Sequence, residues 1–392
     1  MNDKWREFFD KGVDRRGTDC LKWDGLEGFC GNGDAIALWV ADMDFSTPQQ
    51  VIDAMVERAK HGAFGYTEYG EKHFVAFRDW MQNRHGLSVE KDWILTSDGV
   101  VDSMVFCLRA MAKEGTRVAI FSPCYGPFFS MPKLAGYDLY ISPLLDTPDG
   151  WKMDLDNLED GFKQGDISVF MLCNPHNPVG RVWTRDELER FTALCNRYGV
   201  QILSDEIHMD FEMPGYKQVP MLTVKGAEDS VMLTSATKTF NLAALRHSSI
   251  IAPNKDVRCK IVSVMSDCMA ASPNLFGYIA QTAAYTYGGE WLDNLILYLD
   301  ESSRYTDDFL KASLPEIQTA PLEGTYLKFL DMRELGMEHA ELVRFLSQKA
   351  CIALGNGLGF GEEGRCFMRM NIATPRANIE EALDRLAKAV RG

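Results

Sequence analysis

Lys238 is the residue in this sequence with the clearest capacity for covalent chemistry. It lies in the run 235–241, directly after the apolar segment 231–234, and small hydroxyl residues flank it. Burial at the end of a strand lowers the pKa of a lysine amine and frees its lone pair to attack a carbonyl group. The alternatives are an ordinary loop lysine, or the S-x-x-K pattern of a serine acyl-enzyme formed by Ser235 and Lys238. The second alternative lacks the S-D-N and K-T-G elements that accompany that pattern.

An acidic residue, Asp205, follows another apolar segment in the same way. Segment 201–203 leads into the run 204–210, which holds three acids and His208. A carboxylate in that place is costly to bury unless a cation meets it. The same run could be read as a metal site, but it has no ligand spacing such as H-E-x-x-H, and we expect no metal. A cationic partner for Asp205 is the preferred interpretation.

Two further runs complete a set of four polar clusters. Two Asn-Pro steps in 174–180 force a turn directly after segment 168–173, and the Asn177 amide could bind a ligand oxygen there. Gly99 and Val100 begin a predicted helix, where backbone N–H groups and the helix dipole favour a phosphate. Either run alone could be no more than a turn.

Together the four clusters offer a lysine amine, a buried acid, an amide donor and a phosphate-binding helix end. Ligands of open α/β sheets bind at the carboxyl ends of the strands, so clusters that follow strands should converge on one site. Pyridoxal 5′-phosphate has the matching groups: an aldehyde, a pyridine nitrogen, a phenolic oxygen and a phosphate. We therefore expect pyridoxal 5′-phosphate as the cofactor.

Seven short apolar segments supply the strands that must position these clusters. They show little alternation, as expected of strands covered by helices on both faces. Helical stretches separate them; in one, Thr184 and Glu187 form a capping box and Gly199 ends the helix. This alternation predicts an α/β fold with a mostly parallel seven-stranded sheet. The predicted strands are 93–96, 118–121, 139–143, 168–173, 201–203, 231–234 and 248–252.

The pattern of predicted elements changes after residue 253. Longer helices and fewer strands follow, which indicates a small α+β domain. The first 45 residues are dense in Gly, Asp and Trp and predict an extended arm. We expect three parts: the arm 1–45 joining the small domain, a large cofactor-binding domain 46–285 and a small domain 286–392. The run 359–364 fits G-x-G-x-x-G by letters, but it precedes a predicted strand and holds two glutamates, so we expect a loop. The C-terminal elements are predicted as helices 256–269, 290–314, 338–349 and 378–390 and strands 325–330 and 367–372.

Composition excludes several classes of partner. The chain has 392 residues, a formal net charge of −15 and 46% hydrophobic residues. The acidic balance argues against nucleic acid, because a phosphate backbone is bound by clustered Lys and Arg. No apolar run is long enough to cross a membrane, and the N-terminus lacks the apolar core of a signal peptide. Ten scattered cysteines without a C-x-x-C pair indicate free thiols in the cytoplasm.

Five runs in this order resemble one known group of enzymes. The chain resembles the fold-type I pyridoxal-phosphate enzymes of the class I/II aminotransferase superfamily, and within it the MalY/PatB-like cystathionine β-lyase (C–S lyase) branch. The resemblance extends over essentially the whole chain. It rests on residues 39–45, 174–180, 205–208, 235–241 and 369–375.

The resemblance implies roles for the residues near the cofactor ring. Lys238 would bond the aldehyde and later move the substrate Cα proton, and Asp205 would pair with the pyridinium nitrogen. Asn177 and His208 would lie near the phenolic oxygen; the aminotransferases usually carry Tyr where this chain has His208. Tyr125 would stack on the face of the ring.

The resemblance also implies how phosphate and substrate are bound. Gly99, Val100, Ser235 and Arg246 would contact the phosphate, and Tyr66 would reach it from the other subunit of a homodimer. Arg369 would grip the substrate carboxylate through paired hydrogen bonds that a Lys could not reproduce, with Ala41 and Asn177 beside it. Lys238, Tyr125 and Tyr66 are the expected catalytic residues.

The reaction implied by the resemblance is β-elimination from a sulfur amino acid. Cystathionine or a related cysteine thioether would yield a thiol, pyruvate and ammonia. An aminotransferase that moves the amino group to a keto acid would use the same residues. A third alternative is a cofactor-bound regulatory protein, although no helix with a basic DNA-reading face is evident.

Overall fold

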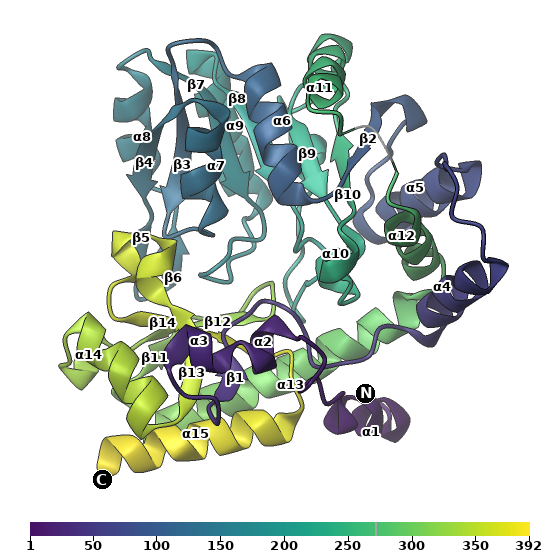
Figure 1. Cartoon of the computed structure of the whole chain (residues 1–392). Helices are drawn as coiled ribbons and strands as arrows, with labels where there is room; N and C mark the ends of the chain where they lie inside the picture. Colours follow the sequence, from purple (N-terminus) through teal and green to yellow (C-terminus); the bar gives the residue numbers. More distant parts are fainter. Residues whose placement is uncertain (271–272) are drawn as a thin grey trace.

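The seven-stranded sheet organises the larger part of the molecule. The computed structural model describes residues 1–270 and 273–392. Its strands run in the order β2-β10-β9-β8-β7-β3-β4, near the top of Figure 1. The strands are β2 (Ile94–Ser97), β3 (Arg117–Ser122), β4 (Asp138–Pro143), β7 (Ile167–Cys173), β8 (Gln201–Asp205), β9 (Val231–Thr234) and β10 (Ser248–Ile251).

The predicted α/β fold is confirmed, and each of the seven predicted strands lies within two residues of an observed one. Strands β9, β8, β7, β3 and β4 pair in parallel, whereas β10 is antiparallel to both β2 and β9. Every residue of β7 is buried. Strands of this kind need helices on both faces, which explains why their sequences do not alternate.

Crossover helices cover the sheet and end where the sequence signals predict. Helix α9 (Arg185–Tyr198) begins with the Thr184–Glu187 capping box and ends at Gly199, whose φ is 66°. Helix α6 (Val100–Met111) begins at the predicted residue. The other covering helices are α7 (Pro127–Ala135), α8 (Leu155–Phe162) and α11 (Lys255–Asp267), and α12 (Leu275–Tyr287) packs against α4 (Gln49–His61) and α5 (Glu71–His85).

A smaller sheet lies below the first in Figure 1, in the order β1-β13-β14-β12-β11. It is accompanied by the long helix α13 (Gly289–Ser313) and by α15 (Arg376–Arg391). The predicted helix 338–349 is α14 (His339–Arg344), which continues as a π-helical turn. The strands are β1 (Ile36–Leu38), β11 (Gln318–Thr319), β12 (Leu327–Asp331), β13 (Ile352–Asn356) and β14 (Phe367–Asn371), and β5 (Leu145–Thr147) with β6 (Gly150–Lys152) forms a separate hairpin.

The prediction of an extended N-terminal arm is wrong in part. The segment forms three helices, α1 (Asp3–Lys11), α2 (Leu21–Asp24) and α3 (Leu26–Cys30), before β1 pairs in parallel with β13. Two of these helices have only four or five residues, too few to leave a periodic pattern in the sequence. Helix α1 is longer, and the Asn2 side chain caps it by accepting from Trp5 N. The divisions at residues 45 and 285 stay a prediction.

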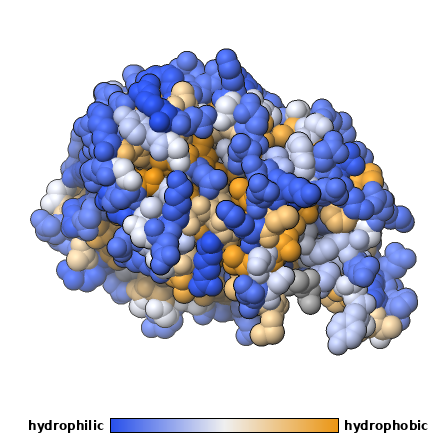
Figure 2. Space-filling view, turned by 90° about the horizontal axis from the view of Figure 1, so that it is seen from above, coloured by the Kyte–Doolittle hydropathy of each residue, from blue (hydrophilic) through white to orange (hydrophobic). Residues whose placement is uncertain are grey.

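The chain carries a formal net charge of −15. Hydrophilic side chains cover most of the face seen from above (Figure 2). In the residues that the structure describes, no helix is both long and apolar enough to cross a bilayer.

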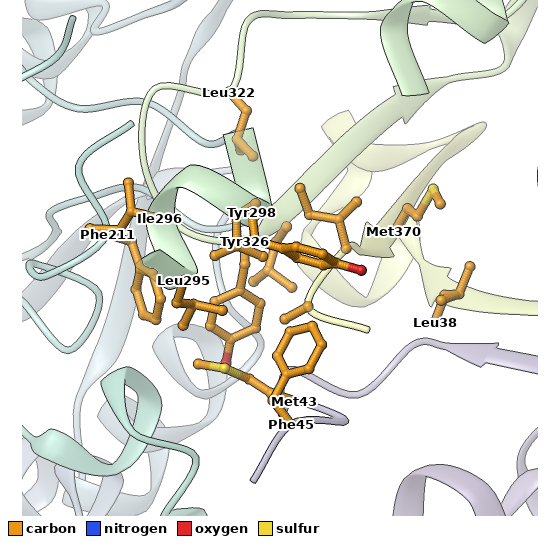
Figure 3. Packing of buried hydrophobic residues seen from close by; sticks show 14 of the residues in the cluster. Leu38, Met43, Phe45, Phe211, Leu295, Ile296, Tyr298, Leu322, Tyr326 and Met370 are labelled. Carbon is orange, nitrogen blue, oxygen red and sulfur yellow. The ribbon is translucent and has the colours of Figure 1, made fainter. Parts of the chain in front are cut away.

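An aromatic cluster joins the N-terminal segment to α13 and β12 (Figure 3). Phe45 lies edge-on to Phe9 and to Tyr298, with ring centroids 5.1 and 5.6 Å apart. Tyr326, just before β12, packs edge-on against Phe211 at 4.9 Å. These rings hold the chain around residues 43–45 between the two sheets.

The carboxylate of Asp44 anchors this segment from within. It is 2% exposed and accepts hydrogen bonds from Lys22 Nζ at 2.7 Å, Trp23 Nε1 at 2.9 Å and Thr374 Oγ1 at 2.8 Å. Lys22 is itself fully buried. A buried pair of this kind is expensive to break, because removal of one charge leaves the other without compensation.

We expect Asp44→Asn to lower the free energy of unfolding by about 3–5 kcal/mol, because Lys22 would become a buried cation without its anion. Chemical denaturation measures the loss. Asp14→Asn is the matched control, since Asp14 is 77% exposed. A loss for Asp44→Asn no larger than that for Asp14→Asn would show that this pair does not stabilise the fold.

Candidate active site

The four polar clusters meet at one cavity of about 310 Å³. Asp205 is the last residue of β8, Lys238 follows β9, and Asn177 follows β7. The prediction that clusters at the carboxyl ends of neighbouring strands converge is therefore confirmed. Among the predicted site residues, the lining includes Ala41, Gly99, Val100, Tyr125, Asn177, Asp205, His208, Lys238 and Arg246.

Lys238 is presented to the cavity by the short helix α10 (Ala236–Thr239). Ser235 caps this helix by accepting a hydrogen bond from Thr237 N at 3.0 Å, and Thr239 Oγ1 donates to the buried Asp210 at 2.6 Å. Lys238 Nζ donates to the carbonyl oxygen of Ala41 at 2.7 Å. Burial, together with the positive charge of Arg369, lowers the pKa of Lys238 to about 8, which favours the uncharged, nucleophilic amine.

Asp205 is a buried acid, and in the described chain the only hydrogen bond to its carboxyl group comes from the backbone. Ile207 N donates to its Oδ1 at 3.1 Å, and its exposed fraction is 5%. Burial raises the pKa of Asp205 to about 7. A carboxyl group in this condition is suited to a ligand that brings a positive charge or a proton to it.

The other polar residues of the run 204–210 face different surroundings. Glu206 accepts from Ser204 Oγ, Gln218 Nε2 and Met221 N, whereas Asp210 accepts from Trp80, His85 and Thr239. Within residues 1–270 and 273–392, no three His, Cys, Asp or Glu side chains converge as metal ligands. His208 lines the cavity, and burial lowers its pKa, so the ring is neutral.

The N-terminus of α6 opens onto the same cavity. No side chain caps this helix, so its first N–H groups remain available for an anion. Behind the turn, Ser103 Oγ donates to the Gly99 carbonyl at 3.1 Å and holds it in place. The Arg246 side chain is 62% exposed at the rim and pairs with Asp102 at 2.7 Å.

Ser235 and Tyr66 lie outside the cavity lining, as does Arg369, which is described next. The Ser235 hydroxyl is buried, caps α10 and donates to the carbonyl oxygen of His247 at 2.5 Å; Thr237 lines the cavity close by. Tyr66 lies on the loop between α4 and α5 and is fully exposed in the single chain. Their roles at the phosphate stay predictions.

Arg369, on β14, is a buried cation beside the cavity. Its NH1 donates to Asn177 Oδ1 at 3.1 Å and its NH2 donates to the Trp39 carbonyl at 3.0 Å. Nε has no partner among the described residues. Burial lowers the pKa of Arg369 to about 10, and no carboxylate in the described chain pairs with it. A buried guanidinium with unused donors is suited to an anionic ligand.

Sequence analysis missed several residues that build the site. Tyr326 OH donates to the Ala41 carbonyl at 2.9 Å, the same oxygen that Lys238 contacts. Asn371 Nδ2 donates to the carbonyls of Val40 and Asp42, each at 2.6 Å. Asn371 lies within the run 369–375, so that run could have indicated a role for it. Nothing in the sequence around Tyr326 indicates a contact with residue 41.

Comparison with known proteins agrees with this geometry. The family model for aminotransferase class I and II matches residues 34–386. Cystathionine beta-lyase PatB of Bacillus subtilis is 36% identical over 97% of this chain and 99% of its own length. Protein MalY of Escherichia coli is 33% identical, with 98% of each chain covered. The crystal structure of cystalysin from Treponema denticola, which contains pyridoxal 5′-phosphate, superposes with a TM-score of 0.94 at 33% identity and 98% coverage of both chains.

The match of the family model spans both sheets, and the relatives align over nearly their full length. The chain therefore belongs to the class I and II aminotransferase family, and within it to the MalY/PatB-like branch.

Proposed function

We propose that this chain is a pyridoxal-phosphate-dependent C–S β-lyase that cleaves cystathionine or related cysteine thioethers to a thiol, pyruvate and ammonia. The observation that carries the proposal is the pair Lys238 and Asp205, a buried amine and a buried acid that face one cavity. The relatives support the choice of reaction, since PatB is named a cystathionine beta-lyase and cystalysin contains the cofactor.

The residues at the cavity fit pyridoxal 5′-phosphate on their own chemistry. The amine of Lys238 suits an aldehyde, and the carboxyl of Asp205, which makes no ion pair in the described chain, suits a pyridine nitrogen. The uncapped N-terminus of α6 suits a phosphate, with Gly99, Val100, Arg246 and the nearby Ser235 as its proposed ligands. Asn177, His208 and Tyr125 also line the cavity. The first two would be polar neighbours for the phenolic oxygen, and Tyr125 would offer an aromatic face to the ring.

Each side chain has a task in the reaction. When bound, the cofactor accepts the electron pair that remains on the substrate when its Cα proton leaves. Lys238 takes up that proton, because its lowered pKa keeps part of the amine uncharged. Asp205 would hold a proton or positive charge at the ring nitrogen. Tyr125 lines the cavity, and its ring would help to exclude water from it.

Arg369 provides the recognition of the substrate. Its unused N–H groups would bind an α-carboxylate, the one anion shared by all amino-acid substrates. Asn177 and Ala41 stand beside it: the first accepts from Arg369 NH1, and the second places its carbonyl against Lys238 Nζ. We propose these three residues as the substrate-binding set.

We also propose that the protein works as a homodimer in the cytoplasm, with Tyr66 entering the phosphate site of the partner subunit. Helices α4, α5 and α12 line a cavity of about 1750 Å³ at one side of the molecule (Figure 1). Large apolar side chains are exposed beside it, among them Phe64 at 59% and Tyr287 at 61%. A second copy would cover them. All ten cysteines are free, which suits a reducing compartment.

Turnover without a keto acid tests the proposed reaction. The purified protein should release thiol, pyruvate and ammonia in equal amounts from L-cystathionine, and a persulfide in place of the thiol from L-cystine, because elimination needs no second substrate. Colorimetric thiol and coupled pyruvate assays measure the products. Turnover that stops after one equivalent and resumes only when a keto acid is added would identify an aminotransferase instead.

Lys238→Ala tests the cofactor. The protein as purified should be yellow, and borohydride should attach the cofactor permanently to Lys238, as peptide mass spectrometry can verify. The Ala variant should lose both the attachment and turnover, because it has no amine at this position. Lys163→Ala, which changes an exposed lysine, is the control and should retain both. A colourless wild-type protein that takes up no pyridoxal phosphate would contradict the proposal.

Mixing two inactive variants tests the shared site. Lys238→Ala and Tyr66→Ala chains, after subunit exchange, should form hybrids in which one site is intact and the other carries both defects. In a two-fold dimer with random exchange, activity should recover to about a quarter of the wild-type value. Tyr216→Phe, at another exposed tyrosine, should remain active alone. No recovery after verified exchange would show that each site is built within one chain.

A further inference from the structure

The loop between β13 and β14 reaches the candidate site although sequence analysis assigned it no role. It forms two 3-10 turns, Gly357–Phe360 and Glu362–Gly364. Cys124 N donates to the Phe360 carbonyl at 2.8 Å, and Ser122 Oγ donates to the Glu363 carboxylate. The loop thus joins the small sheet to the turn that carries Tyr125.

The aromatic ring of Phe360 lies against the guanidinium of Arg369. The Arg369 Cζ atom is 4.7 Å from the ring centroid, and both side chains are 6% exposed. Phe329 meets Phe360 edge-on at 6.1 Å and stacks on Phe367 at 4.8 Å. Phe329 fixes the Phe360 ring, so one face of the guanidinium is covered by a rigid apolar surface.

Gly355, on β13, makes room for the stem of the same arginine. It pairs with Arg369 across the two strands. A Cβ added at Gly355 would lie 3.3 Å from Arg369 Cβ and 3.4 Å from its Nε, closer than most side-chain contacts. The arginine therefore runs over bare backbone, and any side chain at position 355 would push it sideways.

Two hydrogen bonds complete the restraint without using all the donors. NH1 is held by Asn177 and NH2 by the Trp39 carbonyl, and each terminal nitrogen keeps a second N–H. Arginine normally loses much rotamer freedom when it binds a ligand. A side chain already held in its binding orientation avoids that loss.

We infer that Phe360 and Gly355 form a slot that orients the Arg369 guanidinium before the substrate binds, so that Phe360 is a positioning residue for recognition of the α-carboxylate. The inference rests on the proposed function in one respect, that the ligand of Arg369 is a carboxylate. Phe360 acts through Arg369 and has no part in proton transfer.

The test compares Phe360→Leu with Phe367→Leu in the holoenzyme. Both changes remove one ring from the same cluster, but the ring of Phe367 lies beneath the half-exposed Arg333, 4.7 Å away, and not beneath Arg369. The ligands are glycine and glycinamide, which share an amino group and differ in the carboxylate. The change in cofactor absorbance on titration gives both dissociation constants, so the measurement does not depend on turnover.

Phe360→Leu should raise the dissociation constant of glycine about tenfold and leave that of glycinamide unchanged, because a buried cation–π contact is lost only from the carboxylate site. With the thioether substrate, KM should rise by a similar factor while kcat changes little. Gly355→Ala should also raise the dissociation constant of glycine. Phe367→Leu should bind both ligands as the wild type does. If Phe360→Leu does not fold, Phe360→Met replaces it, since Met keeps the apolar volume without the aromatic face.

Arg369→Lys distinguishes the role of the Phe360–Gly355 slot from the role of Arg369 as the carboxylate site. If Arg369→Lys weakens the binding of glycine but not of glycinamide, while the Phe360 and Phe367 variants bind both ligands alike, the proposed slot is wrong and the proposed carboxylate site stands. If Arg369→Lys affects both ligands equally, or neither, the carboxylate assignment itself is wrong.

Discussion

The backbone of residues 39–45 is the support on which the candidate site depends, and the carbonyl of Ala41 is its centre. This oxygen accepts from Lys238 Nζ, after β9 of the large sheet, and from Tyr326 OH, beside β12 of the small sheet. Neighbouring backbone groups on the segment are held by Arg369, Asn371 and Asn241. An extended segment with unpaired N–H and C=O groups must find partners when it is buried, and here side chains at the candidate site provide them.

The site concentrates charges that the fold itself leaves poorly compensated. Burial shifts the pKa values of Asp205, Lys238 and Arg369 away from their usual ranges. By contrast, the buried Lys22 and Asp44 meet each other directly at 2.7 Å. Paired buried charges of this kind stabilise the fold, whereas buried charges without a direct partner remain available to a ligand. Uncompensated burial is tolerated mainly at functional sites.

Sequence analysis recovered what is encoded locally. The strands of the large sheet are continuous apolar runs, and the polar residues that follow β7, β8 and β9 could be identified from that position alone. Contacts between distant segments left no local pattern, which is why Tyr326 and Phe360 were not recognised. The short helices at the N-terminus were missed for another reason: tertiary packing, such as the burial of Trp23 and Leu26, stabilises them more than helical periodicity does.

The parallel pairing of β1 with β13 has a consequence for synthesis on the ribosome. Ile36 pairs with Ile352, so β1 is synthesised long before its strand partner β13. The large sheet, between residues 94 and 251, can form while the chain is still growing. During that time β1 has no strand partner, and Tyr326 and Arg369 can reach the backbone of residues 39–41 only after β12 and β14 have been synthesised. A nascent chain that ends before β12 therefore contains Lys238 and Asp205 but lacks Tyr326 and Arg369, which hold the backbone of residues 39–41.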